Sequence, residues 1–453
     1  MDSQQPVDYE SWTKEALIER LRSLDRQAED SAAQTPDGSA PETPRKRKKK
    51  PVKFDFARFP QRKVAFKFSY FGWSYHGLAR QGNALASDEK RQIEEQFPTV
   101  EGEVFKALAK CKLITNESEC DYTRCGRTDR GVSGFGQVIS LYVRSAGRPV
   151  LLPAPEKEFP YINMLNKTLP PGIRMLAWSP VKPDFSARFS CRSRFYRYFF
   201  TEEGLDINAM KDAASRYAGT HDFRNFCRLD PAKQITNFER QVFSIGISPV
   251  PSCVPFLELR GTAFLWHQVR CMMAILLLVG QGLEKPDIVD KLLDIGQTPG
   301  KPEYEMAADT PLVLADCAYD EADVQWIHVR SPGQDMGNMV VLDRVISQQW
   351  GMLNTQAVLA SALLENLRST CIPTSNEPST SDDAQRSLEK WADCRASRMS
   401  RELQGGARFI LGGGKIKYVR KYVPLLQRKQ AESAESRNKA WMERKGNKRA
   451  KNE

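Results

Sequence analysis

The chain has 453 residues, a formal net charge of +11 and a pI near 9.1, so it is long enough for two or more domains with a sizeable core. A positive charge of this size is typical of proteins that bind a polyanion, most often a nucleic acid or an anionic membrane surface. The longest apolar run, at 271–279, is too short to span a bilayer, and the polar, acidic residues 1–10 predict no signal peptide. The ten cysteines form no C-x-x-C pair and only four histidines are present, which argues against a zinc site and for reduced thiols in a cytosolic or nuclear setting.

Residues 1–62 are predicted to precede the folded core. Apolar residues recur at helical spacing over 9–28 and predict an amphipathic helix that serves association with a partner or with itself. Residues 29–51 combine Ser, Thr, Pro and Ala with the basic run at 45–50, so they cannot bury a core and are predicted to be disordered. The basic run fits a nuclear import signal, an RNA-gripping arm or a solvated linker, and the sequence does not decide among them.

Strands alternate with helices over residues 63–330. Alternating apolar residues predict strands at 64–70, 138–143, 194–200, 242–247 and 256–260. Helical spacing, with caps and glycine stops, predicts helices at 99–110, 161–169, 205–218 and 264–282. The mixture predicts an α+β fold of two similar subdomains, 63–190 and 191–330, whose mainly antiparallel sheets are flanked by helices and form a basic central cleft.

The C-terminal third gives weaker signals. Residues 331–426 are predicted to be a helical extension, with a helix at 349–369 and a flexible insert at about 370–406. Residues 427–453 contain nine Lys or Arg and four Glu. This basic tail either tracks RNA phosphates or stays solvated.

The hypothesis of function depends on residues 122–143. In the first half of this stretch, four glycines bracket Asp129, and Arg127 and Arg130 flank it; the second half is a predicted strand. Basic neighbours keep such an acid ionised, and glycines allow the backbone of a ligand to come close. An ordinary solvated hairpin turn has the same local chemistry, so the stretch by itself leaves both interpretations open.

Several motifs together resemble the TruA family of tRNA pseudouridine synthases over roughly residues 63–320. They are RTDRGV around Asp129, RFYRY around Tyr196, GTHDFRNF, FLWHQVR and PLVLADCAYD. The further motifs FGWSYHG, SWTKEALIERL, GTHDFRNFCRLD and KYVPLLQRK resemble the eukaryotic branch that acts just 3′ of the anticodon, at tRNA positions 38 and 39. Relatives commonly carry alanine where this chain has Gly134, and we expect that difference to loosen the loop while the chemical groups stay intact.

The resemblance implies an enzyme that breaks the C1′–N1 bond of a uridine in RNA, turns the base and rejoins it through C5. It implies that Asp129 is the nucleophile or base and that Arg270 pairs with it. Tyr196 would stack on the target base near C5, and Arg127 would fill the space left by the flipped uridine or bind its phosphate. The other implied substrate-binding residues are Arg130, Arg194 and His221. The reaction requires no cofactor and no metal.

Each of these residues also fits a purely structural role. By pattern alone, Tyr196 is equally a strand residue packed in the core, Arg270 a helix arginine with a buried stem, and His221 part of a helix-to-loop cap. The implied partners are the tRNA anticodon stem-loop and a second copy of the chain, with no membrane, in nucleus and cytoplasm. Two alternatives stay open: a catalytically silent tRNA-binding or tRNA-folding protein on the same scaffold, and a synthase of the same family with other target uridines.

Overall fold

The computed structural model describes residues 13, 19, 23, 54–80, 96–148, 151–202, 204–250, 253–328, 336–371, 407–419 and 421–449. The chain divides into two units, Met1–Phe54 and Asp55–Glu453, and every element named below belongs to the second. All but three residues of the helix predicted at 9–28, the whole basic run at 45–50 and nearly all of the insert predicted at 370–406 lie outside the described residues.

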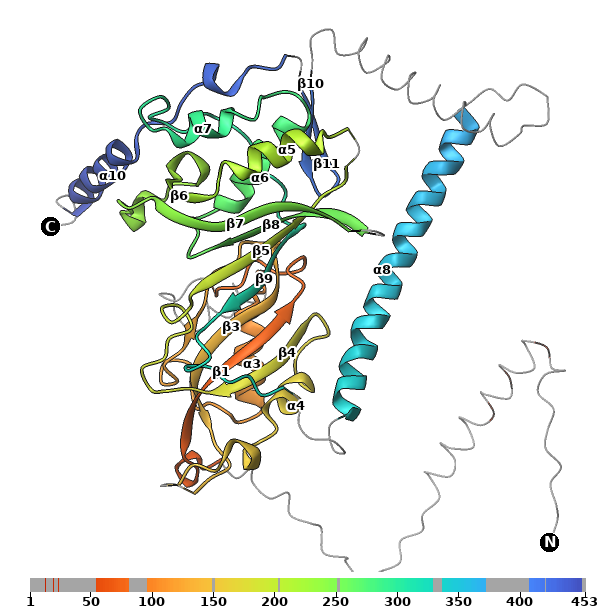
Figure 1. The fold of residues 1–453 in the computed structure, drawn as a ribbon. Coiled ribbons are helices and arrows are strands. Elements are labelled where there is room, and N and C mark those ends of the chain that lie inside the picture. Colours follow the sequence, from red (N-terminus) through yellow and green to blue (C-terminus); the bar gives the residue numbers. More distant parts are fainter. Residues whose placement is uncertain are drawn as a thin grey trace, which may run out of the picture. The chain divides into compact units, whose positions relative to one another are not determined.

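In the described part of the chain, nine strands form one sheet in the order β4-β1-β3-β9-β5-β8-β7-β6, with β2 paired to β3 (Figure 1). All of its strand pairs are antiparallel except β3–β9, which is parallel. The predicted α+β class with mainly antiparallel strands is therefore confirmed. The strands are β1 (Gln61–Tyr70), β2 (Thr123–Arg124), β3 (Ser133–Arg144), β4 (Ile173–Pro180), β5 (Ser193–Phe199), β6 (Gly219–Asp222), β7 (Glu239–Val250), β8 (Cys253–Gly261) and β9 (Leu312–Ala318).

The parallel pair β3–β9 joins the two halves of the sheet, and this junction is called the seam. Strand β9 pairs with β3 through Gly134↔Leu314 and with β5 through Leu314↔Tyr196. Because neighbouring strands lie about 4.8 Å apart, this row places the backbones of Gly134 and Tyr196 roughly 10 Å from each other. The loop that leads into β3, which carries Asp129, therefore lies beside the strand of Tyr196.

Helices pack on the sheet in each half. The first core lies among β1, β3, β4, α3 (Val100–Lys110) and α4 (Tyr161–Asn166), and the second among β5, β7, β8, α5 (Ile207–Ser215), α6 (Gln268–Gly280) and α7 (Ile288–Leu293). A smaller cluster around Cys125, Val138 and Leu314 includes residues on the face of β1 and β3 opposite the first core. Helix α3 starts where predicted, because the Thr99 side chain accepts a hydrogen bond from Gly102 N at 3.2 Å.

Helix α6 begins four residues later than its apolar pattern predicts. Its first residue is Gln268, and His267 before it has left-handed backbone angles, φ 64° and ψ 9°. A side chain at these angles is uncommon outside glycine, asparagine and aspartate. Residues 264–267 therefore form a turn in front of the helix, and this turn faces the Asp129 loop, as shown below.

The C-terminal region contributes to the second core. Helix α8 (Met336–Cys371) is longer than predicted, and β10 (Ala407–Gly412) pairs with β11 (Lys415–Val419) in a hairpin. The predicted basic tail includes helix α10 (Ala434–Arg449), whose first residue, Ala434, is buried in the second core. None of the described helices combines the length and the apolar character that crossing a bilayer requires.

Gly134 is tightly packed, contrary to the looser loop expected from the sequence. A Cβ at this position would lie 2.7 Å from Tyr70 Cε1, closer than carbon atoms approach each other. The Tyr70 hydroxyl lies 2.8 Å from Thr128 Oγ1, next to Asp129 in the loop. Glycine at 134 thus allows the Tyr70 ring to hold the loop in place.

We predict that Gly134→Ala lowers the free energy of unfolding by about 1–3 kcal/mol, the usual cost of inserting a methyl group into a filled site. Chemical denaturation measures this change. Gly246→Ala is the matched control, since Gly246 also lies in a strand but a Cβ added there would have no atom within 4 Å. Equal stability of the two variants would contradict the packing argument.

Candidate active site

The loop that carries Asp129 is anchored through its backbone. The guanidinium of Arg194 donates to Cys125 O at 2.9 Å, and the Gln137 side chain donates to Gly126 O at 3.0 Å. Leu78 N donates to Thr128 O at 3.1 Å. Three carbonyls just before Asp129 are therefore engaged, which limits the positions that the Asp129 side chain can take.

Asp129 contacts the turn in front of α6. Trp266 Nε1 donates a hydrogen bond to Asp129 Oδ1 at 3.2 Å, and His267 Nε2 lies 3.4 Å from Asp129 Oδ2. Each carboxylate oxygen thus faces one ring nitrogen. Neither Trp266 nor His267 was predicted as a site residue. The one available signal was their position within FLWHQVR, the motif that also contains Arg270.

Burial dominates the electrostatics of Asp129. Desolvation raises the pKa of its carboxyl above the ordinary value, and the negative charge of the neighbouring Asp309 raises this pKa further. The positive charge of Arg270 and the hydrogen bond from Trp266 act in the opposite direction and lower the pKa. A carboxylate with little water around it is a stronger base and nucleophile than a solvated one. The surroundings of Asp129 therefore combine partial burial with a hydrogen-bond donor that orients the carboxylate.

His267 is neutral at physiological pH. Burial, reinforced by the charges of Arg270 and Arg228, lowers the pKa of its imidazole to about 4. Its second nitrogen, Nδ1, is buried without a hydrogen-bond partner among the described residues. A neutral ring that faces Asp129 supplies a polar contact without adding a charge to the site.

Arg270 acts on Asp129 through space in this structure. Its Nε donates to Ala307 O at 2.9 Å, and its charge is the largest influence that lowers the pKa of Asp129. In the parts of the chain that the structure describes, no direct ion pair joins the two side chains. The bond to Ala307 fixes the guanidinium at the first turn of α6, close enough to favour the ionised carboxylate.

Tyr196 and Arg194 lie on β5, next to the seam. The Tyr196 ring packs edge-on against Phe264, with centroids 5.2 Å apart, and Phe264 precedes Trp266 by two residues. Burial raises the pKa of the Tyr196 phenol, so this group keeps its proton. Arg194 is buried and donates to the carbonyls of Thr262, Cys125 and Arg188. Its observed contacts tie the Asp129 loop to β5.

The other predicted substrate-binding residues lie in two places, with Arg127 and Arg130 beside Asp129 and His221 at the edge of the sheet. Arg127 and Arg130 are exposed on either side of Asp129, where a polyanion could reach them. His221 lies on β6, the edge strand at the far end of the sheet, and its Nε2 is 2.8 Å from Ala218 O. The structure therefore gathers Asp129, Tyr196, Arg270, Arg127 and Arg130 at the seam and leaves His221 apart from them.

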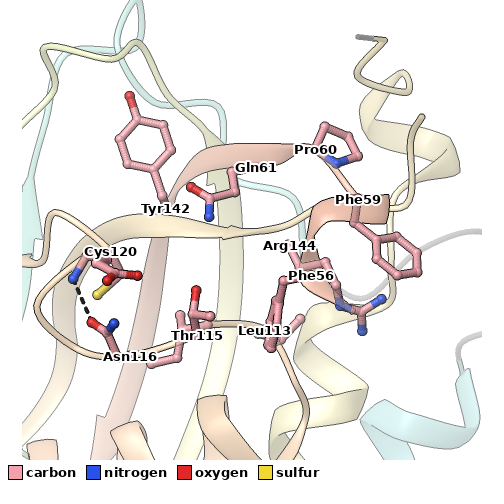
Figure 2. Close-up of a pocket in the computed structure, with 12 residues that line it drawn as sticks. Phe56, Phe59, Pro60, Gln61, Leu113, Thr115, Asn116, Cys120, Tyr142 and Arg144 are labelled. Atoms are coloured by element: carbon pink, nitrogen blue, oxygen red, sulfur yellow. Dashed lines mark hydrogen bonds between the residues drawn. The ribbon is translucent and has the colours of Figure 1, made fainter. Parts of the chain in front are cut away.

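A small pocket in the first half is separate from this site. Figure 2 shows its lining, which includes Gln61 and Arg144. Gln61 begins β1 and pairs with Arg144 at the end of β3, whereas Asp129 precedes the start of β3. The pocket and Asp129 thus lie at opposite ends of the same strand pair, so the pocket takes no part in the chemistry proposed for Asp129.

The arrangement can carry out chemistry on a base that is held out of its stack. A desolvated carboxylate lies beside the strand of an aromatic ring, and exposed arginines flank it. Carboxylates placed in this way attack an electrophilic carbon or remove a proton, and an aromatic ring holds a flat base by stacking.

The chain is similar to a family model and to several proteins that are all named tRNA pseudouridine synthases. Residues 213–320 match the family model described as tRNA pseudouridine synthase. The chain is 37% identical to the human tRNA pseudouridine(38/39) synthase, over 95% of this chain and 88% of the relative. It is 45% identical to the protein of that name from Saccharomyces cerevisiae, over 70% and 73% of the two chains. It is 33% identical to tRNA pseudouridine synthase A of Methanothermobacter thermautotrophicus, over 57% and 82%.

We predict that Asp129→Asn raises the free energy of unfolding at neutral pH. Because the pKa of Asp129 is raised in the folded state, the folded protein binds this proton more tightly than the unfolded chain does. The wild type therefore loses stability as the pH rises through the interval above the ordinary aspartate pKa, and the amide removes that loss. Urea denaturation between about pH 4 and 7 measures the difference.

Asp287→Asn is the control for this prediction, because the hydrogen bond from Lys291 lowers the pKa of Asp287. Removal of the Asp287 carboxylate is expected to lower the free energy of unfolding or to leave it unchanged, since this group is exposed. A less stable Asp129→Asn variant at neutral pH would show that the carboxylate stabilises the fold, against the prediction.

Proposed function

The chain belongs to the tRNA pseudouridine synthase family, whose members are isomerases that act on tRNA, and we propose that it converts uridine to pseudouridine in the anticodon stem-loop at positions 38 and 39. Membership rests on the relatives described above and confirms the resemblance of the sequence motifs. The choice of positions is supported by the names of relatives that are 37% and 45% identical to this chain. The single observation that supports the assignment of the chemistry is the half-buried Asp129 carboxylate at the seam.

Asp129 is proposed as the group that starts the reaction. Conversion of uridine to pseudouridine breaks the C1′–N1 bond and forms a C1′–C5 bond, so the atoms of the nucleotide are conserved except that a proton moves from C5 to N1. A carboxylate beside the ribose acts either as the nucleophile at C1′ or as the base at C2′. Burial and the contacts of Trp266 and His267 suit it to either role.

Tyr196 and the exposed arginines are proposed to hold the flipped nucleotide. Tyr196 keeps its phenolic proton because burial raises its pKa, so it serves as a stacking surface near C5. Arg127 and Arg130 lie exposed beside Asp129, where they bind phosphate or fill the space that the base has left. Arg194 supports the loop through Cys125 O.

A catalytically silent tRNA-binding protein is the second candidate. Such a protein needs the cationic surface but gains nothing from a desolvated acid, which costs stability. The raised pKa of Asp129 and the two ring nitrogens facing its oxygens therefore favour an enzyme.

We predict that Asp129→Asn abolishes pseudouridine formation while tRNA binding is retained. The amide has nearly the same shape but supplies neither a nucleophile nor a base. Unmodified tRNA is incubated with each protein, pseudouridine is mapped at single-nucleotide resolution, and binding is measured in parallel. Wild-type product at positions 38 and 39 is expected. Product at other uridines would reassign the target, and product from the variant would exclude Asp129 as the reactive group.

A homodimer is proposed as the working form. Support comes from helix α8, which carries exposed apolar side chains, including Trp350 at 67% and Leu364 at 52% exposure. Residues at alternating spacings of four and three follow one side of the helix, a pattern typical of coiled-coil pairing. They are Ile346, Trp350, Leu353, Ala357, Ala360, Leu364 and Leu367. Location in both nucleus and cytoplasm is likewise proposed, on the basis of the basic run at 45–50.

We predict that Trp350→Glu combined with Leu364→Glu increases the monomer fraction measured by light scattering. Two acids on the apolar side repel their counterparts in an associated helix pair. Thr355→Glu is the control, because Thr355 lies outside the apolar repeat on the same exposed helix. A wild-type monomer at working concentration, or a dimer that the double substitution leaves intact, would contradict pairing through α8.

A further inference from the structure

The indole of Trp266 contacts two cationic side chains, Arg228 and Lys233, in addition to its hydrogen bond to Asp129. The guanidinium carbon of Arg228 lies 5.0 Å from the centre of its ring, and Lys233 Nζ lies 4.8 Å from it. At such distances a cation is attracted to the electron-rich face of an indole. Trp266 therefore connects two positive charges to the reactive carboxylate.

The segment that holds these cations is built into the fold. Arg228 N donates to Trp266 O at 2.9 Å, which ties the two segments together next to the ring. Lys233 ends a short 3-10 turn that begins after Asp230. Helix α10 packs against this turn, and Asn438 Nδ2 donates to Ile235 O at 3.1 Å. The backbone of the segment that carries the two cations is thus held next to Trp266.

Of the two cations at Trp266, Lys233 is paired with an acid and Arg228, within the described part of the chain, is not. Arg228 is exposed, and among the described residues no carboxylate forms an ion pair with it. Lys233 lies 3.2 Å from Asp230, but its side chain is 46% exposed. The charges of both cations lower the pKa of the neighbouring His267, and the charge of Lys233 also acts to lower the pKa of Asp129. An anion from solution can therefore bind here beside the reactive group.

We propose that Arg228 and Lys233 bind one backbone phosphate next to the target uridine and that this contact, through Trp266, fixes the Asp129 carboxylate against the ribose. The proposal rests on the proposed function, because the phosphate belongs to the RNA substrate. Arg228 supplies a planar fork of donors that matches two phosphate oxygens, and Lys233 adds a point charge.

The physical advantage is that RNA binding aligns the reacting group. A phosphate bound by both cations holds them over the indole, and the indole N–H then keeps Asp129 Oδ1 in one direction. Binding energy gained away from the reacting atoms is used for orientation at them. Arg228 and Lys233 are therefore binding residues, and Trp266 is a positioning residue.

The decisive test is a double-mutant cycle between protein and RNA. Anticodon stem-loop RNAs are made with a neutral methylphosphonate in place of one phosphate at a time around the target uridine. Affinity is measured in the Asp129→Asn background so that no turnover occurs. One replacement is expected to weaken binding about tenfold and to have little further effect once Arg228→Gln is present. Additive losses at every phosphate would overturn the contact.

Salt dependence provides a second measurement. Arg228→Gln and Lys233→Gln together are expected to reduce the slope of log affinity against log salt concentration by about 0.7 to 0.9, the value for one neutralised phosphate contact, and each substitution alone is expected to remove part of it. Lys211→Gln is the control, since it removes the same charge from the exposed side of α5. Wild-type slopes in both site variants would overturn the proposal.

The role of Trp266 is tested with Trp266→Phe, which keeps an aromatic ring and loses the N–H. The single-turnover rate at saturating RNA is expected to fall about tenfold or more with an unchanged dissociation constant. Since the Trp266 bond lowers the pKa of Asp129, the acidic limb of the pH–rate profile should also move to higher pH. An unchanged profile would show that the bond does not act on the carboxylate.

Failure of this inference is distinguishable from failure of the proposed function. Wild-type protein that forms no pseudouridine in tRNA would remove the proposed function itself. If the wild type is active and the Arg228→Gln and Lys233→Gln variants bind RNA with wild-type affinity and salt dependence, only the proposed phosphate site is excluded.

Discussion

The hydrogen bond from Trp266 Nε1 to Asp129 Oδ1 joins residues that are 137 positions apart in the chain. One residue precedes β3 in the first half of the sheet, and the other precedes α6 in the second half. Strand β9 pairs with both β3 and β5, and this register joins the two halves that supply the bonded residues. The surroundings of Asp129 therefore depend on both halves, and a slip of one residue in either pairing would move Asp129 away from its partners.

The same region has to reconcile a buried acid with a polyanionic substrate. Burial makes the Asp129 charge costly, and Arg270 and Trp266 offset part of that cost. Lys233 is paired with Asp230 but half exposed, and Arg228 has no carboxylate partner among the described residues, which is why we propose that both bind an RNA phosphate beside the carboxylate. In the functions that we propose for them, the acid and the two cations belong to one cluster of charges, with the indole of Trp266 between its parts.

Periodicity identified most elements but misplaced those whose backbone changes direction. Helix α3 follows its apolar spacing and its Thr99 cap. Helix α6 starts late because His267 adopts left-handed angles, and an apolar pattern that continues through 264–267 gives no sign of that turn. The sequence of strand β9 does not reveal which strands pair with it, since seven residues carry no information on their distant partners. The charge of helix α10 predicts a solvated tail and hides the anchoring of Ala434 in the core.

The sequence by itself determined the local chemistry: an acid between arginines on a glycine-rich loop, a tyrosine strand rich in arginine, and motifs that identify the family. These features depend on neighbours within a few residues, so they can be recognised from the sequence alone. Only the tertiary structure decided that Trp266 and His267 face the acid, that Gly134 makes room for Tyr70, that Arg228 and Lys233 lie on Trp266, and that His221 is remote. The reason is that contacts between distant segments are set by strand register and helix packing, which depend on the whole core rather than on any single motif.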